Sequence, residues 1–329
     1  MSEQFQAYQV GKTEDGQRCA LTQLDDSDLM DGDVTVRVEY TTLNYKDGLA
    51  LTGRSPIIRK FPLTPGIDFS GTVLDSEHAD FKAGDQVILN GFGVGEAHSG
   101  GYAQKARVSG DWLVPVPDGL DTRRAMAIGT AGYTAMLCVL ALEGHGIKPD
   151  AGDILVTGAA GGVGSVAVAV LSKLGYRVVA STGRLQESEF LQGLGAAEVV
   201  DRSGFAEPAR PLGREVWAGA IDVAGGNTLA NVLSQIKRGG AAAICGLAES
   251  MNLPTSVAPF ILRGIAMYGI DSVMAPIPLR KQAWQRLVSD LDFKLLDELS
   301  FDLDFADLPQ AGADILDGKI RGRAIVKLP

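Results

Sequence analysis

A glycine-rich run at residues 156–168 has residue types that suit close contact with phosphate groups; it reads VTGAAGGVGSVAV. Glycine lets the backbone approach a ligand, and the first N–H groups of a following helix attract negative charge. The spacing is that of the dinucleotide fingerprint Gly-x-Gly-x-x-Gly, with Ala159 in the first glycine position. A purely structural glycine turn is the alternative interpretation. The residues expected to contact a pyrophosphate are Ala160, Gly161, Gly162, Val163 and Gly164.

The elements around this run fit a sheet with helices on both faces. A short apolar strand at 154–157 precedes it, and a helix follows with an apolar stripe from Val163 to Leu174. Repeated strand–helix units with short apolar strands indicate a doubly wound parallel sheet of the α/β class, the fold in which this fingerprint binds dinucleotides. Further strands are expected at 177–180, 198–200, 220–224 and 241–245, with helices at 187–194 and 228–236.

The end of the second strand distinguishes between two dinucleotides. NAD-binding proteins usually carry an acidic residue about 20 residues after the glycines, where it accepts from the ribose 2′-hydroxyl. This chain has Thr182, Gly183 and Arg184 there and no acid. A hydroxyl and a guanidinium can bind a 2′-phosphate, so NADPH is the expected cofactor; a solvated Arg184 is the alternative. Arg202, after the third strand, is expected to cover the adenine or reach the same phosphate, and chance exposure explains it equally well.

The first 120 residues have a different pattern. Residues 34–40 alternate between apolar and polar types with the period of a half-buried strand, and short apolar runs follow at 69–74, 86–89 and 112–116. Helical periodicity is hardly visible, so we expect a partly open, strongly bent antiparallel barrel. Residues 122–142 indicate a helix interrupted at Gly129 and Gly132. The C-terminal 60 residues, with a helix at 280–291 and a strand at 323–326, are expected to return to this β-rich domain.

The chain of 329 residues is long enough for two domains. The pattern places a dinucleotide-binding domain at 126–265, inserted into a catalytic domain formed by 1–125 and 266–329. The formal charge of −10 disfavours nucleic acids and anionic membranes as partners. Three widely spaced cysteines predict no disulfide framework. Neither a leader nor a stretch of about 18 apolar residues is found, so a cytoplasmic location is expected.

Three motifs resemble the quinone oxidoreductase branch of the medium-chain dehydrogenase/reductase superfamily; they lie at 43–47, 65–73 and 159–165. Four runs are similar to the acryloyl-CoA reductase family within that branch; they lie at 44–47, 129–132, 216–222 and 269–273. The resemblance covers essentially the whole chain. It implies a GroES-like catalytic domain together with a Rossmann domain, and a homodimer is expected because dimers are common among such proteins.

The resemblance also implies an activity. Family members use NADPH to reduce the carbon–carbon double bond of acryloyl-CoA to propanoyl-CoA, by hydride transfer to the β-carbon, so an enoyl-CoA thioester is the expected substrate. Zinc-dependent members of the superfamily carry Gly-His-Glu where this chain has Gly66-Ile67-Asp68, and the chain has no cysteine cluster, so no metal is expected. The histidines are interpreted as surface residues: His78, His98 and His145.

Catalytic roles are carried over to segments that match the family. Tyr45, expected in a loop after the strand at 34–40, is the first candidate for nicotinamide contact or proton donation, and a core tyrosine is its alternative. Lys46 or Asp47 can orient the site, or equally form a structural ion pair. Some related enoyl reductases place a tyrosine where this chain reads Arg-Ser-Pro at 54–56, which leaves the proton donor open. Further cofactor contacts are expected at Thr130, Leu247, Ser272 and Arg321.

Several cations have two interpretations. Arg321 and Arg323 can reach a phosphate, or they are charges on an edge strand. Arg54, Arg59 and Lys60 form the nearest basic group for coenzyme A, or belong to an exposed loop.

Two rival functions are compatible with the motifs. A quinone, enone or aldehyde reductase of the same superfamily would share every cofactor residue. A non-catalytic nucleotide-binding or RNA-binding protein is disfavoured by the acidic charge and the lack of basic–aromatic clusters.

Overall fold

Six parallel strands form one sheet of the structure, a computed structural model that describes residues 4–14 and 16–329. The strand order β10-β9-β8-β11-β12-β13 reverses direction between β8 and β11, which makes the sheet doubly wound. The predicted α/β fold class is confirmed. The strands are β8 (Ile154–Val156), β9 (Val178–Thr182), β10 (Glu198–Asp201), β11 (Trp217–Asp222), β12 (Ile236–Ile244) and β13 (Ala266–Gly269).

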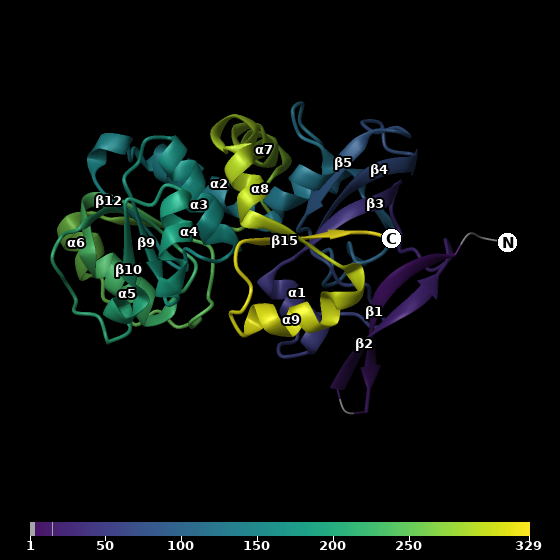
Figure 1. Cartoon of the computed structure of the whole chain (residues 1–329), viewed down its shortest axis with the longest axis horizontal. Helices are drawn as coiled ribbons and strands as arrows, with labels where there is room; N and C mark the ends of the chain where they lie inside the picture. The colour runs from purple at the N-terminus through teal and green to yellow at the C-terminus, as the bar shows by residue number, and fades with distance from the viewer. Residues whose placement is uncertain (1–3, 15) are drawn as a thin grey trace. The chain divides into compact units, whose positions relative to one another are not determined.

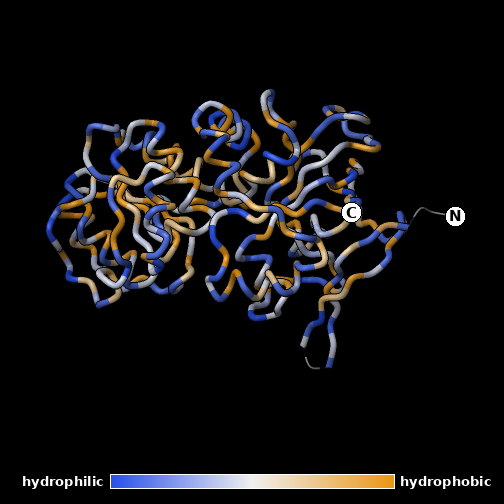
Figure 2. Tube along the Cα trace, in the orientation of Figure 1, coloured by the Kyte–Doolittle hydropathy of each residue, from blue (hydrophilic) through white to orange (hydrophobic). Residues whose placement is uncertain are grey.

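Helices cover this sheet and are connected to its strands as βαβ units (Figure 1). Right-handed crossovers on either side of the reversal place α3 and α4 on one face and α5 and α6 on the other. The central strands β8, β9 and β11 are buried along their whole length. Figure 2 shows hydrophobic residues along these strands and polar residues in the outer loops. The helices are α3 (Gly162–Lys173), α4 (Ser188–Gly193), α5 (Gly226–Gln235) and α6 (Ala258–Arg263).

A second, mixed sheet has the order β14-β15-β3-β4-β5-β7, with β6 also paired to β3. All its pairs are antiparallel except β14 with β15. A separate antiparallel hairpin is formed by β1 (Phe5–Thr13) and β2 (Gly16–Leu24). The strands of the mixed sheet are β3 (Val34–Leu43), β4 (Asp68–Ser76), β5 (Gln86–Asn90), β6 (Lys105–Val108), β7 (Leu113–Pro115), β14 (Ser300–Leu303) and β15 (Arg323–Lys327).

The chain divides into two compact units that match these two sheets. The first unit contains residues up to 130 together with 273–284 and 296–329, and the second contains 131–272 and 285–295. The expected domain boundaries, after residues 125 and 265, stay a prediction. Along the chain, helix α1 (Tyr45–Thr52) lies between β3 and β4. Helices α8 (Phe293–Leu299) and α9 (Leu308–Leu316) lie before and after β14. In the first unit α1 packs against α9.

Helix α2 (Thr122–His145) is the longest described helix, and Gly129 interrupts it with φ 53° and ψ −163°. The interruption at Gly129 was predicted, whereas Gly132 lies in regular helix. An 18-residue window of α2 has a mean hydropathy of 1.8, so the expectation of no such apolar stretch is wrong. Of that window 89% is buried inside the protein, as in a core helix.

Two other expectations differ from the structure. Helix α1 lies in the region where helical periodicity was hardly visible. Tyr45, which was expected in a loop, is the first residue of this helix. The three histidines, interpreted as surface residues, are only partly exposed; His78, for example, packs against Phe81 with ring centroids 5.6 Å apart. The remaining helices are α7 (Ile277–Asp290) and the short 3-10 turns Gly110–Trp112, Pro149–Ala151, Leu185–Glu187, Arg202–Phe205 and Phe305–Asp307.

Candidate functional site

The residues predicted to bind the pyrophosphate lie at the N-terminus of α3, in the second unit. Strand β8 ends at Val156, and the chain turns through Gly158, whose φ of 57° favours glycine. The Ser165 N–H donates to the Gly161 carbonyl as α3 begins, so the N–H groups of residues 162–164 have no partner four residues back. Residues 161–163 are half-buried. This half-open helix terminus has the donors that bind a pyrophosphate.

Gly164 allows α3 to approach the turn that precedes it. A Cβ at this position would stand 2.5 Å from the Gly158 carbonyl oxygen and 2.6 Å from Ala159 Cα. Both are backbone atoms, which cannot move aside as the end of a side chain can. The third glycine of the fingerprint is therefore required for helix–strand packing.

Asp222 lies at the carboxyl end of β11, next to the point where the strand order reverses. Its Oδ1 accepts from Thr157 Oγ1 at 2.7 Å and its Oδ2 accepts from the Gly225 N–H at 2.8 Å. Burial raises the pKa of this carboxyl, while these hydrogen bonds oppose the rise. The sequence interpretation assigned Asp222 no role, although an acid at the end of a buried strand marks the ligand-binding edge of such sheets.

Thr182 and Arg184 lie at the carboxyl end of β9, as predicted. Thr182 Oγ1 accepts from the Arg184 N–H at 3.0 Å, and Arg184 Nη2 donates to the Ala160 carbonyl oxygen at 3.1 Å. The guanidinium therefore lies against the glycine-rich turn and is half-buried, unlike a freely solvated loop charge.

Arg202 follows β10 and lies over Gly183. A Cβ on Gly183 would stand 2.5 Å from Arg202 Nε and 2.9 Å from its Cζ. Asp201, its exposed neighbour, accepts from the Ser203 N–H at 2.8 Å and caps the turn that follows. Two guanidinium groups and one hydroxyl are thus gathered at one corner of the sheet, a set that suits a phosphate monoester.

Two further predicted cofactor residues lie in the second unit. Leu247 follows β12 and is 55% exposed. Ser272 is half-buried, near the end of the unit's main segment. Their roles stay predictions.

The candidate catalytic residues of the first unit occupy the first turn of α1. Tyr45 is 43% exposed. Lys46 Nζ lies 2.8 Å from Glu96 Oε1, so it forms the alternative ion pair. Asp47 is fully buried, and its two oxygens accept from the Asn44 N–H at 2.9 Å and the Ile67 N–H at 3.0 Å.

A buried polar network lies behind this turn. Asp68 accepts from Thr42 Oγ1 at 2.6 Å and from Asn44 Nδ2 at 3.1 Å. Arg323 Nη1 donates to Asn44 Oδ1 at 3.3 Å. Burial, then the charge of Asp68, raises the pKa of Asp47 to about 7. The sequence interpretation missed this network; an acid directly before an apolar strand was the available signal.

The position of Arg323 in the structure contradicts both interpretations that the sequence offered. Its side chain is 2% exposed, and β15 lies between β14 and β3, so it is neither a phosphate-reaching surface residue nor a charge on an edge strand. Burial lowers the pKa of its guanidinium, while Asp68 and Asp47 oppose the shift. Arg321 is exposed, and its cofactor role stays a prediction.

Thr130 is half-buried at the break in α2. Its N–H donates to Asp68 Oδ2 at 2.7 Å, and its Oγ1 accepts from Asn90 Nδ2 at 3.2 Å. Of the basic residues considered for coenzyme A, Arg54 pairs with Asp317 at 2.9 Å and Arg59 with Glu96 at 3.7 Å.

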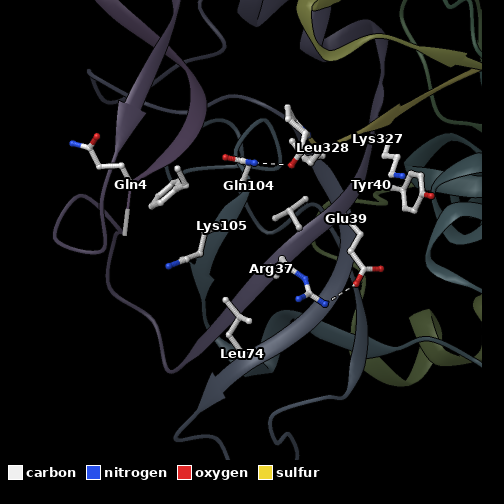
Figure 3. A pocket seen from close by; sticks show the side chains of 12 residues that line it. Gln4, Arg37, Glu39, Tyr40, Leu74, Gln104, Lys105, Lys327 and Leu328 are labelled. Carbon is white, nitrogen blue, oxygen red and sulfur yellow. Dashed lines mark hydrogen bonds and ion pairs between the residues drawn. The ribbon is translucent and has the colours of Figure 1, made fainter. Parts of the chain in front are cut away.

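A hollow of about 650 Å³ lies elsewhere on the first unit (Figure 3). Arg37, Lys105 and Lys327 line it with apolar residues, and Lys105 is engaged by Asp26 at 2.7 Å. None of the predicted site residues lines this hollow.

Comparison with known proteins identifies the family. Residues 30–118 match the alcohol dehydrogenase GroES-like domain, and residues 162–291 match the zinc-binding dehydrogenase domain. The chain is 54% identical to the probable acrylyl-CoA reductase AcuI of Escherichia coli K12, over 96% of this chain and 97% of that protein. It is 52% identical to the acrylyl-CoA reductase AcuI of Ruegeria pomeroyi, over 98% of each.

A solved structure agrees with these relatives. The YhdH oxidoreductase of Salmonella enterica, crystallised in complex with NADP, superposes with a TM-score of 0.97 at 50% identity, covering 98% of this chain and 100% of that chain. The predicted GroES-like and Rossmann architecture and the predicted family are confirmed.

One of the matching domains is described as a zinc-binding dehydrogenase, but the described residues of this chain do not fit a zinc ion. Among residues 4–14 and 16–329 no group of three His, Cys, Asp or Glu side chains is placed to hold a metal ion. Ile67 offers no donor atom, and both oxygens of Asp68 accept hydrogen bonds from Thr42, Asn44 and the Thr130 backbone. The chain belongs to the acrylyl-CoA reductase family of the medium-chain dehydrogenase/reductase superfamily.

Proposed function

We propose that the protein is an NADPH-dependent oxidoreductase that reduces the carbon–carbon double bond of acryloyl-CoA to give propanoyl-CoA. One observation carries the cofactor assignment: Arg184 and Arg202 lie beside Thr182, at the same sheet edge as the open N-terminus of α3. The substrate class is supported by two relatives that are more than 50% identical over nearly the whole chain.

The second unit has the groups to hold NADPH. The N–H groups of residues 162–164 would bind the pyrophosphate, because their positive dipole end compensates its charge. Arg184 and Arg202 would bind the 2′-phosphate by charge-assisted hydrogen bonds. Gly164 lets α3 pack against the glycine-rich turn, and Gly183 leaves room for the side chain of Arg202.

When bound, NADPH supplies the hydride that the reaction adds to the β-carbon of the thioester. Negative charge then develops on the thioester oxygen, and each oriented donor of the protein that faces it contributes about 3 kcal/mol. We assign proton donation, or contact with the nicotinamide, to Tyr45, because it is the exposed residue of the first turn of α1. Asp47 holds that turn from inside, and Lys46 is restrained by Glu96.

A substrate panel tests the proposal. Oxidation of NADPH is followed with acryloyl-CoA, with a quinone and with a short enone, at equal enzyme concentrations. We expect the highest kcat/KM with acryloyl-CoA. A higher value with the quinone would replace the substrate assignment with a quinone reductase, and a higher value with the enone would make the protein a general enone reductase.

A variant pair tests the role of Tyr45. Tyr45→Phe keeps the ring and removes the hydroxyl, and Tyr40→Phe is the control because Tyr40 is a half-buried tyrosine on β3. If Tyr45 donates the proton, Tyr45→Phe lowers kcat roughly a hundredfold and the control does not. An unchanged kcat in Tyr45→Phe would leave only cofactor contact for this residue.

The assembly and location are also proposals. Strand β13 ends the parallel sheet, and its residues Met267 and Tyr268 are 37% and 36% exposed. An edge strand offers unpaired backbone groups to a second copy, so we propose a homodimer in the cytoplasm, without nucleic-acid or membrane partners. Light scattering during gel filtration tests the dimer. Met267→Pro would shift it to monomer, because the N–H of Met267 faces away from β12 whereas that of Ile270, three residues on, donates to Ile244.

A further inference from the structure

Two buried charged side chains form hydrogen bonds to the backbone on either side of the break in α2. A break leaves C=O groups before it and N–H groups after it without their helical partners. Here Arg323 Nε donates to the Ala127 carbonyl oxygen at 3.1 Å, and Asp68 Oδ2 accepts from the Thr130 N–H at 2.7 Å. The side chains of Arg323 and Asp68 therefore hold the backbone on both sides of Gly129.

Asn44 joins these two side chains. Its Nδ2 donates to Asp68 Oδ2 at 3.1 Å, and its Oδ1 accepts from Arg323 Nη1 at 3.3 Å. The other oxygen of Asp68 accepts from Thr42 Oγ1 at 2.6 Å. We call Asp68, Asn44 and Arg323 the break clamp. Both oxygens of Asp68 accept hydrogen bonds, so a neutral amide at this position would turn one of these two acceptors into a donor.

The break clamp is a costly way to satisfy a helix break. Asp68 is fully buried and Arg323 is 2% exposed, and each charge taken out of water costs several kcal/mol. Arg323 Nη2 has no hydrogen-bond partner among residues 4–14 and 16–329, and a Cβ at position 129 would collide with it. Water or a neutral cap could satisfy an exposed break more cheaply. Buried charges are weak evidence for stability, so their use here indicates a need for fixed geometry.

Hydrogen bonds hold both the backbone and the side chain of Thr130, the residue directly after Gly129. Its N–H is held by Asp68, and its Oγ1 by Asn90 Nδ2 at 3.2 Å. Asn90 is itself 2% exposed, and its carbonyl oxygen accepts from the buried Arg280 Nη1 at 2.6 Å. Thr130 is thus restrained through both its backbone and its side chain, although it is half-buried.

We propose that Asp68 and Arg323 are positioning residues for hydride transfer, which fix the backbone around Gly129 and thereby the place of Thr130 beside the nicotinamide. The inference rests on the proposed function, because that function gives Thr130 a cofactor to contact. A displacement of a reacting group by about 1 Å can cost roughly a hundredfold in rate. The break clamp acts on kcat, and the phosphate contacts of the second unit act on NADPH binding.

The test is a double-mutant cycle with a matched control. Asp68→Asn removes the charge at nearly constant volume, Thr130→Ala removes the hydroxyl that the clamp positions, and the third variant combines both. Ser70→Ala is the control: it lies two residues along β4 and removes a buried 2.7 Å hydrogen bond from Ser70 Oγ to the Thr122 carbonyl at the other end of the same helical segment. Arg323→Lys tests the second charge, because an ammonium cannot reach both Ala127 and Asn44 as the guanidinium does.

The expected results separate positioning from stability. Asp68→Asn and Arg323→Lys should lower kcat by roughly ten- to a hundredfold, with the calorimetric Kd for NADPH changed less than about threefold. The double variant should be little slower than the slower single variant, because residues that act as a unit are not additive. Amide hydrogen exchange at 127–131 should become faster in Asp68→Asn and stay unchanged in Ser70→Ala.

Two results would overturn the inference. One is a loss of kcat in Asp68→Asn no larger than in Ser70→Ala at a similar change in melting temperature. The other is rate losses that multiply in the double variant. If the wild-type protein reduces a quinone and not acryloyl-CoA, the proposed substrate fails while the cycle is measured on the quinone. A wild-type protein that transfers hydride to no acceptor removes both claims.

Discussion

Arg202 lies across Gly183, and the two residues come from the carboxyl ends of the neighbouring strands β10 and β9. A Cβ on Gly183 would stand 2.5 Å from Arg202 Nε. The absence of a side chain at 183 therefore determines where the second arginine of the phosphate corner lies. In the sequence Thr182, Gly183 and Arg184 are consecutive. The structure adds that Gly183 leaves room for the side chain of Arg202, which follows the neighbouring strand.

Gly183→Ala should displace Arg202 and weaken NADPH binding. The backbone at 183 has no positive φ, so the added methyl acts through its contact with the guanidinium. Loss of one charge-assisted contact predicts a rise in the NADPH Kd of about tenfold, with little change for NADH. Calorimetric titration measures both. Gly204→Ala is the control, because a Cβ there meets nothing within 4 Å. Equal changes for the two variants would show that Arg202 does not contact the phosphate.

Arg184→Ala should raise the NADPH Kd by roughly ten- to a hundredfold and the NADH Kd much less, because only NADPH has a 2′-phosphate. Arg184→Lys keeps a positive charge but not the planar fork of donors, so an intermediate Kd is expected. The measurement is titration of each variant with both dinucleotides. Equal losses for NADPH and NADH would mean that Arg184 supports the glycine-rich turn through Ala160 and does not distinguish the two cofactors.

The parallel sheet was predictable because its signals are local. A glycine fingerprint between a buried strand and a helix with an apolar stripe involves about 20 consecutive residues. The end of β9 follows soon after that helix. The mixed sheet is different, since β15 joins it from the far end of the chain and pairs with β3. For that reason neither interpretation of Arg323, as a phosphate contact or as a charge on an edge strand, placed it in the interior, where the pairing puts it.

The buried network of the first unit was missed for a related reason. Asp68 and Asn44 are ordinary polar residues in sequence, and only the fold shows that they share hydrogen bonds inside the core. Helix α1 escaped notice because it is eight residues long, too short for a helical stripe to stand out. The interruption at Gly129 was visible, but the charges that bind it were not.

Gly164→Ala should destabilise the protein by about 1–3 kcal/mol and prevent tight dinucleotide binding, because the added Cβ meets backbone atoms that cannot rotate away. Urea denaturation measures the stability, and calorimetry the binding. Gly193→Ala, at an exposed position of α4 where a Cβ meets nothing within 4 Å, should be neutral or stabilising by up to about 1 kcal/mol. A stable Gly164→Ala variant with wild-type affinity for NADPH would contradict the packing role assigned to this glycine.

The stability of the protein should depend on pH through Asp47. Burial, followed by the charge of Asp68, raises the pKa of this carboxyl from 3.8 to about 7, against the N–H groups of Asn44 and Ile67 that lower it. The folded state therefore keeps a proton that the unfolded state has already released between these two values. By linkage, this contribution to stability is fully present below the unfolded pKa and is lost as pH rises to about 7.

Asp47→Asn should remove that slope, because an amide does not titrate. We expect the free energy of unfolding of the wild-type protein to fall between about pH 4 and about pH 7, relative to the same measurement on the Asp47→Asn variant. Denaturant titrations of both proteins at several pH values give the difference directly. Asp68→Asn should lower the pKa of Asp47 and shift the slope toward lower pH, since one negative charge beside it is gone. A wild-type curve parallel to that of Asp47→Asn across this range would show that Asp47 is ionised throughout.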